Sequence, residues 1–119
     1  MRISITALLT AAMLTINSCG NREEVVISTG QGDIHVTLDL KNAPVTSANF
    51  LRYVDAHLFD SSCFYRVVRP DNQPKDSVRI AVIQGGRYEK EETGGFPPIA
   101  HETTDQTGIR HLDGVISMA

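Results

Sequence analysis

The chain has 119 residues, which is enough for one domain and too few for two. Hydrophobic residues make up 41% of it and charged residues 21%, the balance of an ordinary globular protein, and the formal net charge is -3. Lysine and arginine are scattered singly. The chain therefore offers no basic surface for a nucleic acid, and no acidic run predicts a disordered tail.

The first 18 residues are expected to be a targeting segment and not part of the fold. Arg2 supplies a positive start, and residues 3–16 form an apolar run softened by Ser and Thr. A helix needs about 20 apolar residues to span a bilayer, so this shorter run fits the core of a signal peptide. The sequence Ile16-Asn17-Ser18-Cys19 is similar to the lipobox of bacterial lipoproteins, although Asn17 is a less usual residue there.

We therefore expect cleavage before Cys19, a lipidated tether at 19–24 and a domain at 25–119. The anchored protein would lie on the periplasmic side of a bacterial membrane, held stably if the cysteine carries several acyl chains. Gly20 replaces the Asp that retains many lipoproteins at the inner membrane, which favours the outer membrane. An ordinary secretion signal, with Cys19 in this place by chance, is the alternative.

The residues after the tether predict a β-hairpin followed by a helix. Residues 25–29 are β-branched and residues 34–40 alternate between apolar and polar, so each predicts a strand, with a Gly-rich turn at 30–33. Apolar residues at helical spacing predict a helix from about Pro44 to Asp55, because proline suits the first helical turn. His35 falls on the polar face of its strand and is expected on the surface.

Further strands are predicted at 63–68, at 78–84 and, at the end of the chain, at 114–118. Simple alternation along the first of these strands places Phe64 and Arg66 on one face and Cys63 on the other, as a small core residue. Because several strands are apolar on both faces, the sequence predicts a mainly β fold and makes a barrel plausible.

The connecting segments are less regular. Residues 71–76 predict a polar turn, and the Gly and Pro pairs within 87–100 predict a loop. Residues 101–111 are polar and fit neither a helix nor a strand pattern clearly.

The sequence lacks the common catalytic and cofactor motifs. The histidines at positions 35, 57, 101 and 111 share no metal-ligand spacing with one another, with Cys63 or with the carboxylates. There is neither a phosphate-binding Gly-rich loop nor a Gly-x-Ser-x-Gly elbow. We therefore expect no metal and no other cofactor.

Five segments, in chain order, resemble the cyclophilin-type peptidyl-prolyl cis-trans isomerases. They are GDI at 32–34, APVT through NFL at 43–51, FYRVV at 64–68, VIQGG at 82–86 and GVISMA at 114–119. The resemblance covers residues 25–119 and implies an incomplete antiparallel β-barrel with one flanking helix at about 44–55. The family domain continues past Ala119 with further strands and a second helix, so we expect this polypeptide alone to fold poorly and to turn over slowly.

The resemblance also implies a reaction. Rotation about an amide has a barrier of about 18–20 kcal/mol, and a donor near the prolyl nitrogen would stabilise the twisted state. Arg66 matches the catalytic arginine, and Gln84 matches the glutamine that holds the substrate backbone. The expected substrate contacts are Phe64, Tyr65, Ala81, Val82 and Ala119, with Gly94 or Gly95 lining the same groove.

Three positions depart from the family pattern. Tyr65 stands where many members have His, and Ala81 and Val82 stand where many have Phe and Met. Ala81 and Val82 are smaller than Phe and Met and therefore predict a looser pocket for the proline ring.

The resemblance implies proline-containing peptides or unfolded segments of exported proteins as partners, bound by a monomer that reaches the membrane only through its lipid at Cys19. Two alternatives stay open. One is a chaperone-like module with the same groove and little turnover, which Ala81 and Val82 favour slightly. The other is an anchored β-domain with neither activity.

Overall fold

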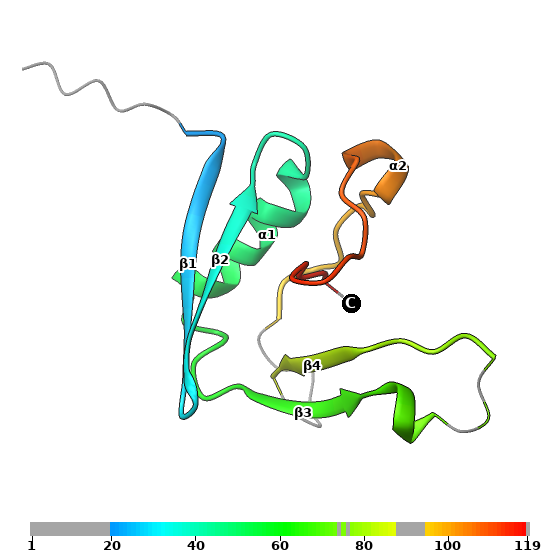
Figure 1. Ribbon diagram of the computed structural model, residues 1–119. Helices are drawn as coiled ribbons and strands as arrows, with labels where there is room; N and C mark the ends of the chain where they lie inside the picture. The colour runs from blue at the N-terminus through cyan, green and yellow to red at the C-terminus, as the bar shows by residue number, and fades with distance from the viewer. Residues whose placement is uncertain (1–19, 74, 76, 88–94, 119) are drawn as a thin grey trace, which may run out of the picture.

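The computed structural model describes residues 20–73, 75, 77–87 and 95–118 of the chain. Its elements in chain order are β1 (Arg22–Thr29), β2 (Gly32–Asp39), α1 (Pro44–Asp55), β3 (Cys63–Val68), the 3-10 helix η1 (Pro70–Asn72), β4 (Val82–Gly86) and the short α2 (Thr104–Thr107) (Figure 1). The expectations for residues 1–19, for Gly94 and for Ala119 fall outside the described residues.

Strands β1 and β2 form an antiparallel hairpin whose register runs without interruption from Arg22↔Asp39 to Thr29↔Gly32. The turn between them needs a glycine, because Gly32 has a φ of +127°, which other residues rarely adopt. Alternation along β2 buries Val36 and Leu38 at 8% and 6% exposure. His35 lies on the opposite, exposed face and pairs with Glu24, as expected for a surface histidine.

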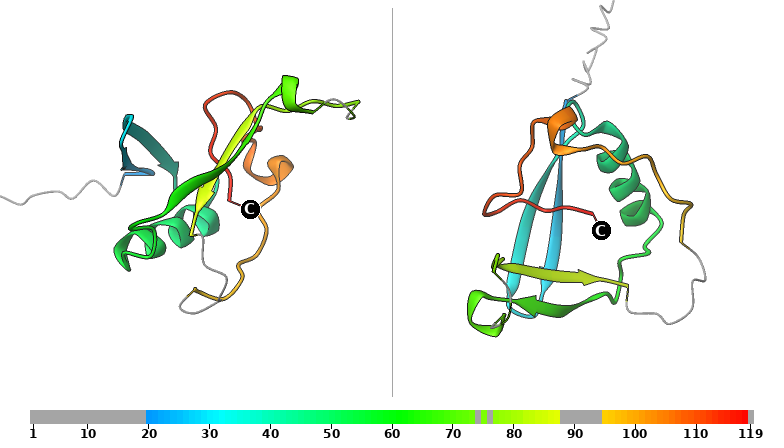
Figure 2. Two further views of the ribbon diagram at one scale, coloured as in Figure 1. Left: turned by 90° about the horizontal axis from the view of Figure 1, so that it is seen from below. Right: turned by 90° about the vertical axis from the view of Figure 1, so that its right-hand side faces the viewer.

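Helix α1 packs against β2 and covers the buried face of this hairpin (Figures 1 and 2). Its observed bounds, Pro44–Asp55, confirm the sequence prediction. The turn into the helix is built on Asp39, whose carboxylate accepts hydrogen bonds from the backbone N–H groups of Lys41 and Asn42 at 3.1 and 2.9 Å. These bonds, first that of the Asn42 amide, hold the pKa of Asp39 below its ordinary value.

Strands β3 and β4 form a second antiparallel hairpin, which crosses below the first one in Figure 1. The prediction for 63–68 is confirmed, but the predicted strand at 78–84 is wrong for its first four residues, since β4 begins only at Val82. The side chain of Gln73 accepts the Ile80 N–H at 3.2 Å and donates to the Ile80 carbonyl at 2.7 Å. Both backbone groups that Ile80 would offer to a strand ladder are thereby occupied.

Residues 95–118 run along the other side of α1 and return to the space between the two hairpins (Figures 1 and 2). The ambiguous region contains the short helix α2, which Thr103 and Gln106 cap reciprocally. The predicted strand at 114–118 is wrong for the described chain. Those residues pair with no neighbouring strand, and a strand requires a partner for its backbone groups.

The described strands form two separate two-stranded sheets and not a closed barrel, so the fold is mainly antiparallel β but open. One consequence concerns Cys63: it is exposed, and the prediction that it is a core residue is wrong. Among the described residues, no helix combines the length and the apolar character that crossing a membrane requires.

Candidate functional site

The register of the β3–β4 hairpin is broken at Tyr65. Phe64 lies opposite Gly85 and Arg66 lies opposite Gln84, so two steps along β3 correspond to one step along β4. Residues directly opposite each other in an antiparallel pair share a face, and neighbours along a strand alternate. Phe64 and Arg66 therefore lie on opposite faces, and the expectation from simple alternation that they share one is wrong.

This irregularity is a β-bulge, and bulges redirect side chains. Tyr65 is the extra residue in β3, and Arg66 keeps its place opposite Gln84. The irregularity thus places the guanidinium and the amide on one face of the hairpin.

Arg66 and Gln84 are in direct contact across the two strands. The Nη1 group of Arg66 donates a hydrogen bond to Oε1 of Gln84 at 3.2 Å, and the pair is exposed. A guanidinium is always charged and presents several donors in a fixed plane. With one donor held by Gln84, the others can reach a bound ligand in a defined orientation, which suits a site that must donate hydrogen bonds to an amide.

Phe64 occupies the other face, and Gly85 makes room for it. A Cβ built on Gly85 would lie only 2.6 Å from Cδ1 of the Phe64 ring. The ring therefore lies directly over the glycine, on the face turned away from Arg66. Phe64 is 46% exposed, and its apolar neighbours on that face are also exposed, Val67 at 54% and Ile83 at 59%. Phe64 thus supports the site hairpin from behind, and the structure does not place it beside Arg66 as a substrate contact.

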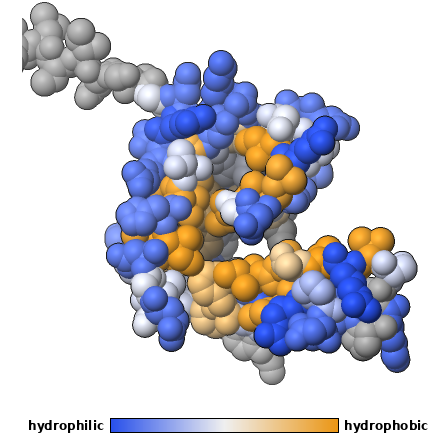
Figure 3. Space-filling model, viewed as in Figure 1, coloured by the Kyte–Doolittle hydropathy of each residue, from blue (hydrophilic) through white to orange (hydrophobic). Residues whose placement is uncertain are grey.

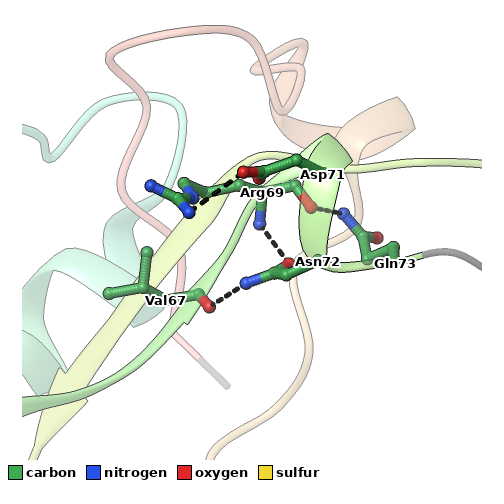
Figure 4. A network of polar contacts seen from close by, with 5 residues as sticks. All are labelled: Val67, Arg69, Asp71, Asn72 and Gln73. Atoms are coloured by element: carbon green, nitrogen blue, oxygen red, sulfur yellow. Dashed lines mark hydrogen bonds and ion pairs between the residues drawn. The ribbon is translucent and has the colours of Figure 1, made fainter.

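The connection between β3 and β4 is fixed by polar side chains (Figure 4). Asn72 accepts the Arg69 N–H at 2.8 Å and donates to the Val67 carbonyl at 3.1 Å. The buried amide of Gln73 donates to the Arg69 carbonyl at 2.7 Å and also holds Ile80, as described above. The predicted polar turn is therefore an ordered cap on the hairpin, next to Ala81 and Val82.

Ala81 and Val82 lie at the start of β4, and both are exposed. Val82 and Gln84 are two residues apart in one strand, so Val82 shares the face of Arg66, whereas Ala81 precedes the ladder. We call the β3–β4 hairpin with its connection the arm. Figure 3 shows apolar side chains along the inner side of this arm, facing a hollow between it and the rest of the described chain. The hollow is open to solvent.

Gly95 lies near side chains from helix α1 and from the residue that follows β4. A Cβ built on it would lie 3.4 Å from the Tyr53 hydroxyl oxygen and 3.9 Å from Nη1 of Arg87, the residue that follows β4. These contacts put Gly95 next to the tip of the Arg87 side chain. They do not show a contact between Gly95 and Arg66.

Two residues near this segment carried no recognisable signal in the sequence. The carboxylate of Glu102 accepts the backbone N–H groups of Val45 and Thr46 at 3.1 and 2.8 Å, at the start of α1. Tyr53, near the end of α1, accepts the Phe96 N–H at 3.0 Å. Both contacts join residues more than forty positions apart, which no local pattern reveals.

The carboxyl group of Glu102 is ionised at the start of α1. Desolvation is the largest single influence on its pKa and raises it, but the hydrogen bonds from Thr46 and Val45 together outweigh this and lower the pKa below its ordinary value. A carboxylate at the N-terminus of a helix is also stabilised by the helix dipole. Among the described residues, no three His, Cys, Asp or Glu side chains come together as metal ligands would.

Comparisons with known proteins point to one family. The family model described as "Cyclophilin type peptidyl-prolyl cis-trans isomerase/CLD" matches residues 24–119. "Peptidyl-prolyl cis-trans isomerase A" of Dickeya dadantii is 29% identical in an alignment of 119 residues that covers 98% of this chain and 54% of that protein. "Peptidyl-prolyl cis-trans isomerase-like 1" of Rhizopus delemar is 30% identical in an alignment of 101 residues that covers 82% of this chain and 55% of that protein. No solved structure matches significantly.

The chain therefore belongs to the cyclophilin-type peptidyl-prolyl cis-trans isomerase family. It spans about half the length of the curated relatives it matches.

Proposed function

We propose that this chain contributes the catalytic arginine of a peptidyl-prolyl cis-trans isomerase and that Arg66 is that residue. The observation that carries the proposal is the contact between Arg66 and Gln84, two polar side chains that meet on an exposed face of the β3–β4 hairpin. No nucleophile or metal is required, because the reaction breaks no covalent bond.

The proposed mechanism follows from the electronic structure of the amide. Resonance makes the C–N bond partly double, and rotation removes that resonance and leaves a lone pair on the prolyl nitrogen. A guanidinium N–H directed at this nitrogen binds the twisted state better than either planar state, which lowers the barrier. Gln84 would orient Arg66 and also bind the substrate backbone, while Val82 contacts the proline ring.

The second candidate is a chaperone-like module that binds proline-containing segments and turns them over little. The exposed, small side chains of Ala81 and Val82 favour it, because they offer little apolar surface to hold a proline ring. Under this alternative the chain would bind denatured client proteins as well without Arg66 as with it.

We further propose that the protein acts on exported proteins as a lipid-anchored monomer. The apolar run at 3–16 and Cys19 support this proposal. Replacing Cys19→Ala should abolish incorporation of radiolabelled palmitate and move the protein from the membrane fraction to the released fraction. Unchanged labelling of this variant would contradict the lipid anchor.

The catalytic proposal is tested by the rate of cis-to-trans isomerisation of a proline-containing peptide in the presence of the chain. Arg66→Ala should lower kcat/KM by at least about 100-fold, on the scale of losing one group that stabilises a transition state. Arg79→Ala is the matched control, since it removes an exposed arginine from the same arm and should leave the rate unchanged.

Binding of a denatured client protein, measured on the same variants, separates the two candidates. Loss of turnover with retained binding supports an isomerase in which Arg66 acts on the twisted state. Catalysis that survives Arg66→Ala contradicts the proposal.

A further inference from the structure

One face of helix α1 holds residues 95–118, the described segment that follows the β3–β4 hairpin. Three contacts between α1 and residues 95–118 start from Thr46, Asn49 and Tyr53. These positions are three and four residues apart, so they form one stripe along the helix. Glu102 binds at the first, Met118 Sδ lies 3.7 Å from the Asn49 side-chain nitrogen, and Phe96 binds at the third.

The first contact supplies something that the helix lacks. Ala43 provides no side-chain cap for α1, and the first turn contains no acidic residue. The first N–H groups of a helix have no partner within it. Glu102 binds two of them, and thus caps the helix from another part of the chain.

The last contact is reinforced by aromatic packing. The Tyr53 ring meets the Phe96 ring edge to face, with 5.0 Å between centroids, and the Arg52 guanidinium lies 3.9 Å over the Phe96 ring. The Phe96 N–H donates to the Tyr53 hydroxyl at the same place. Phe96 is therefore held by its backbone N–H and by the contacts of its ring with Tyr53 and Arg52.

This second attachment lies beside the side chain of the residue that follows β4, the strand that carries Gln84. Gly95 precedes Phe96, and a Cβ built on it would lie near both the Tyr53 hydroxyl and Nη1 of Arg87. Movement of Phe96 away from Tyr53 would carry Gly95 away from the Arg87 guanidinium. Arg87, three residues after Gln84, would then lose one of the neighbours that limit where its side chain lies.

We propose that Tyr53 and Glu102 are positioning residues of the peptide-binding site, a two-point clamp through which α1 holds residues 95–102 beside the side chain of Arg87, the residue that follows β4. The inference rests on the proposed isomerase function. Neither residue touches Arg66 or Gln84, so their effect is on where a substrate binds and not on the rotation itself.

The test uses Tyr53→Phe and Glu102→Gln in the 119-residue chain, with Glu23→Gln on β1 as the matched control for Glu102→Gln. Tyr53→Phe keeps the ring and removes the hydroxyl, so hydrogen exchange of the Phe96 amide should accelerate by about fivefold. Glu102→Gln keeps one acceptor oxygen for two N–H groups and should accelerate exchange at Val45 or Thr46. Circular dichroism checks that each variant is folded.

The functional readout is the division of the effect between KM and kcat. Each clamp variant should raise KM, and the Kd for an unreactive proline-containing peptide, by about three- to tenfold while kcat stays within about twofold. Glu23→Gln should change none of these quantities. Faster Phe96 exchange with unchanged KM and Kd would overturn the positioning role alone.

Failure of the underlying function gives a different result. A wild-type chain that neither binds nor isomerises the peptide overturns the proposed function and the positioning role with it, even if the exchange rates change as expected. A fall in kcat at constant KM in the clamp variants would also overturn the proposal, because it would place these residues in the rotation step.

Discussion

The two hairpins of this chain are built alike but differ in what covers them. In the β1–β2 hairpin α1 covers the apolar face, so that Val36 and Leu38 are buried. In the β3–β4 hairpin the apolar face that carries Phe64, Val67 and Ile83 is largely exposed. Among the described residues, the first hairpin thus holds two of the three buried hydrophobic side chains, and the third, Val68, lies in β3. The second hairpin otherwise displays its apolar side chains and carries Arg66 and Gln84. Most of the buried apolar packing and the candidate site therefore lie in different parts of the chain.

The largest expected effect that tests this difference is on the free energy of unfolding. Leu38→Ala removes a buried side chain and should lower it by about 2–4 kcal/mol, since it loses packing and leaves a cavity. Val67→Ala removes a side chain that is already exposed and should lower it by less than about 0.5 kcal/mol. Urea unfolding measures both. Equal losses in the two variants would show that the second hairpin has a buried core of its own.

Two glycines sharpen the comparison with a smaller effect. Gly85→Ala should lower the free energy of unfolding by about 1–2 kcal/mol, because the new Cβ would meet the Phe64 ring at 2.6 Å and force it to move. Gly30→Ala, in the turn of the first hairpin, meets nothing within 4 Å and should change stability by less than about 0.5 kcal/mol. If Gly85→Ala were as stable as the wild type, Phe64 would not be held over the glycine.

The smallest expected effect is on how the free energy of unfolding depends on pH. Because the pKa of Glu102 is lowered in the folded state, its contribution to stability is complete above the unfolded pKa of about 4.5 and is lost as the pH falls through the lower folded value. Between pH 6 and pH 3 the wild type should therefore lose more stability than Glu102→Gln, as measured by urea unfolding. Asp39 titrates in the same direction in both proteins, so the difference isolates Glu102. Identical pH profiles would contradict the capping role.

Local features of this chain could be predicted from the sequence. Helix α1 begins and ends where Pro44 and the apolar spacing place it, and β3 has its predicted bounds. Arg66 and Gln84 were expected at one site, and the structure brings them into contact. The helix and strand predictions succeed because helical spacing and alternation depend on neighbouring residues.

Features that depend on pairing could not be predicted. The bulge at Tyr65 is a property of the register between β3 and β4, so alternation within β3 alone placed Phe64 on the wrong face. Ile80 left the predicted strand because Gln73, seven residues earlier, binds its backbone. The contact of Glu102 with Thr46 in α1 joins residues 56 positions apart, and the sequence around Glu102 gives no sign of this partner.

The central claim is that Arg66 and Gln84 act as one unit on the substrate, and a double-mutant cycle on kcat/KM tests it most directly. If Gln84 orients Arg66, the loss in Arg66→Ala should already contain most of the loss in Gln84→Ala, and the double variant should be no more than about twofold below Arg66→Ala alone. If instead the two losses simply multiply in the double variant, the residues act independently, and the account of a paired site is wrong.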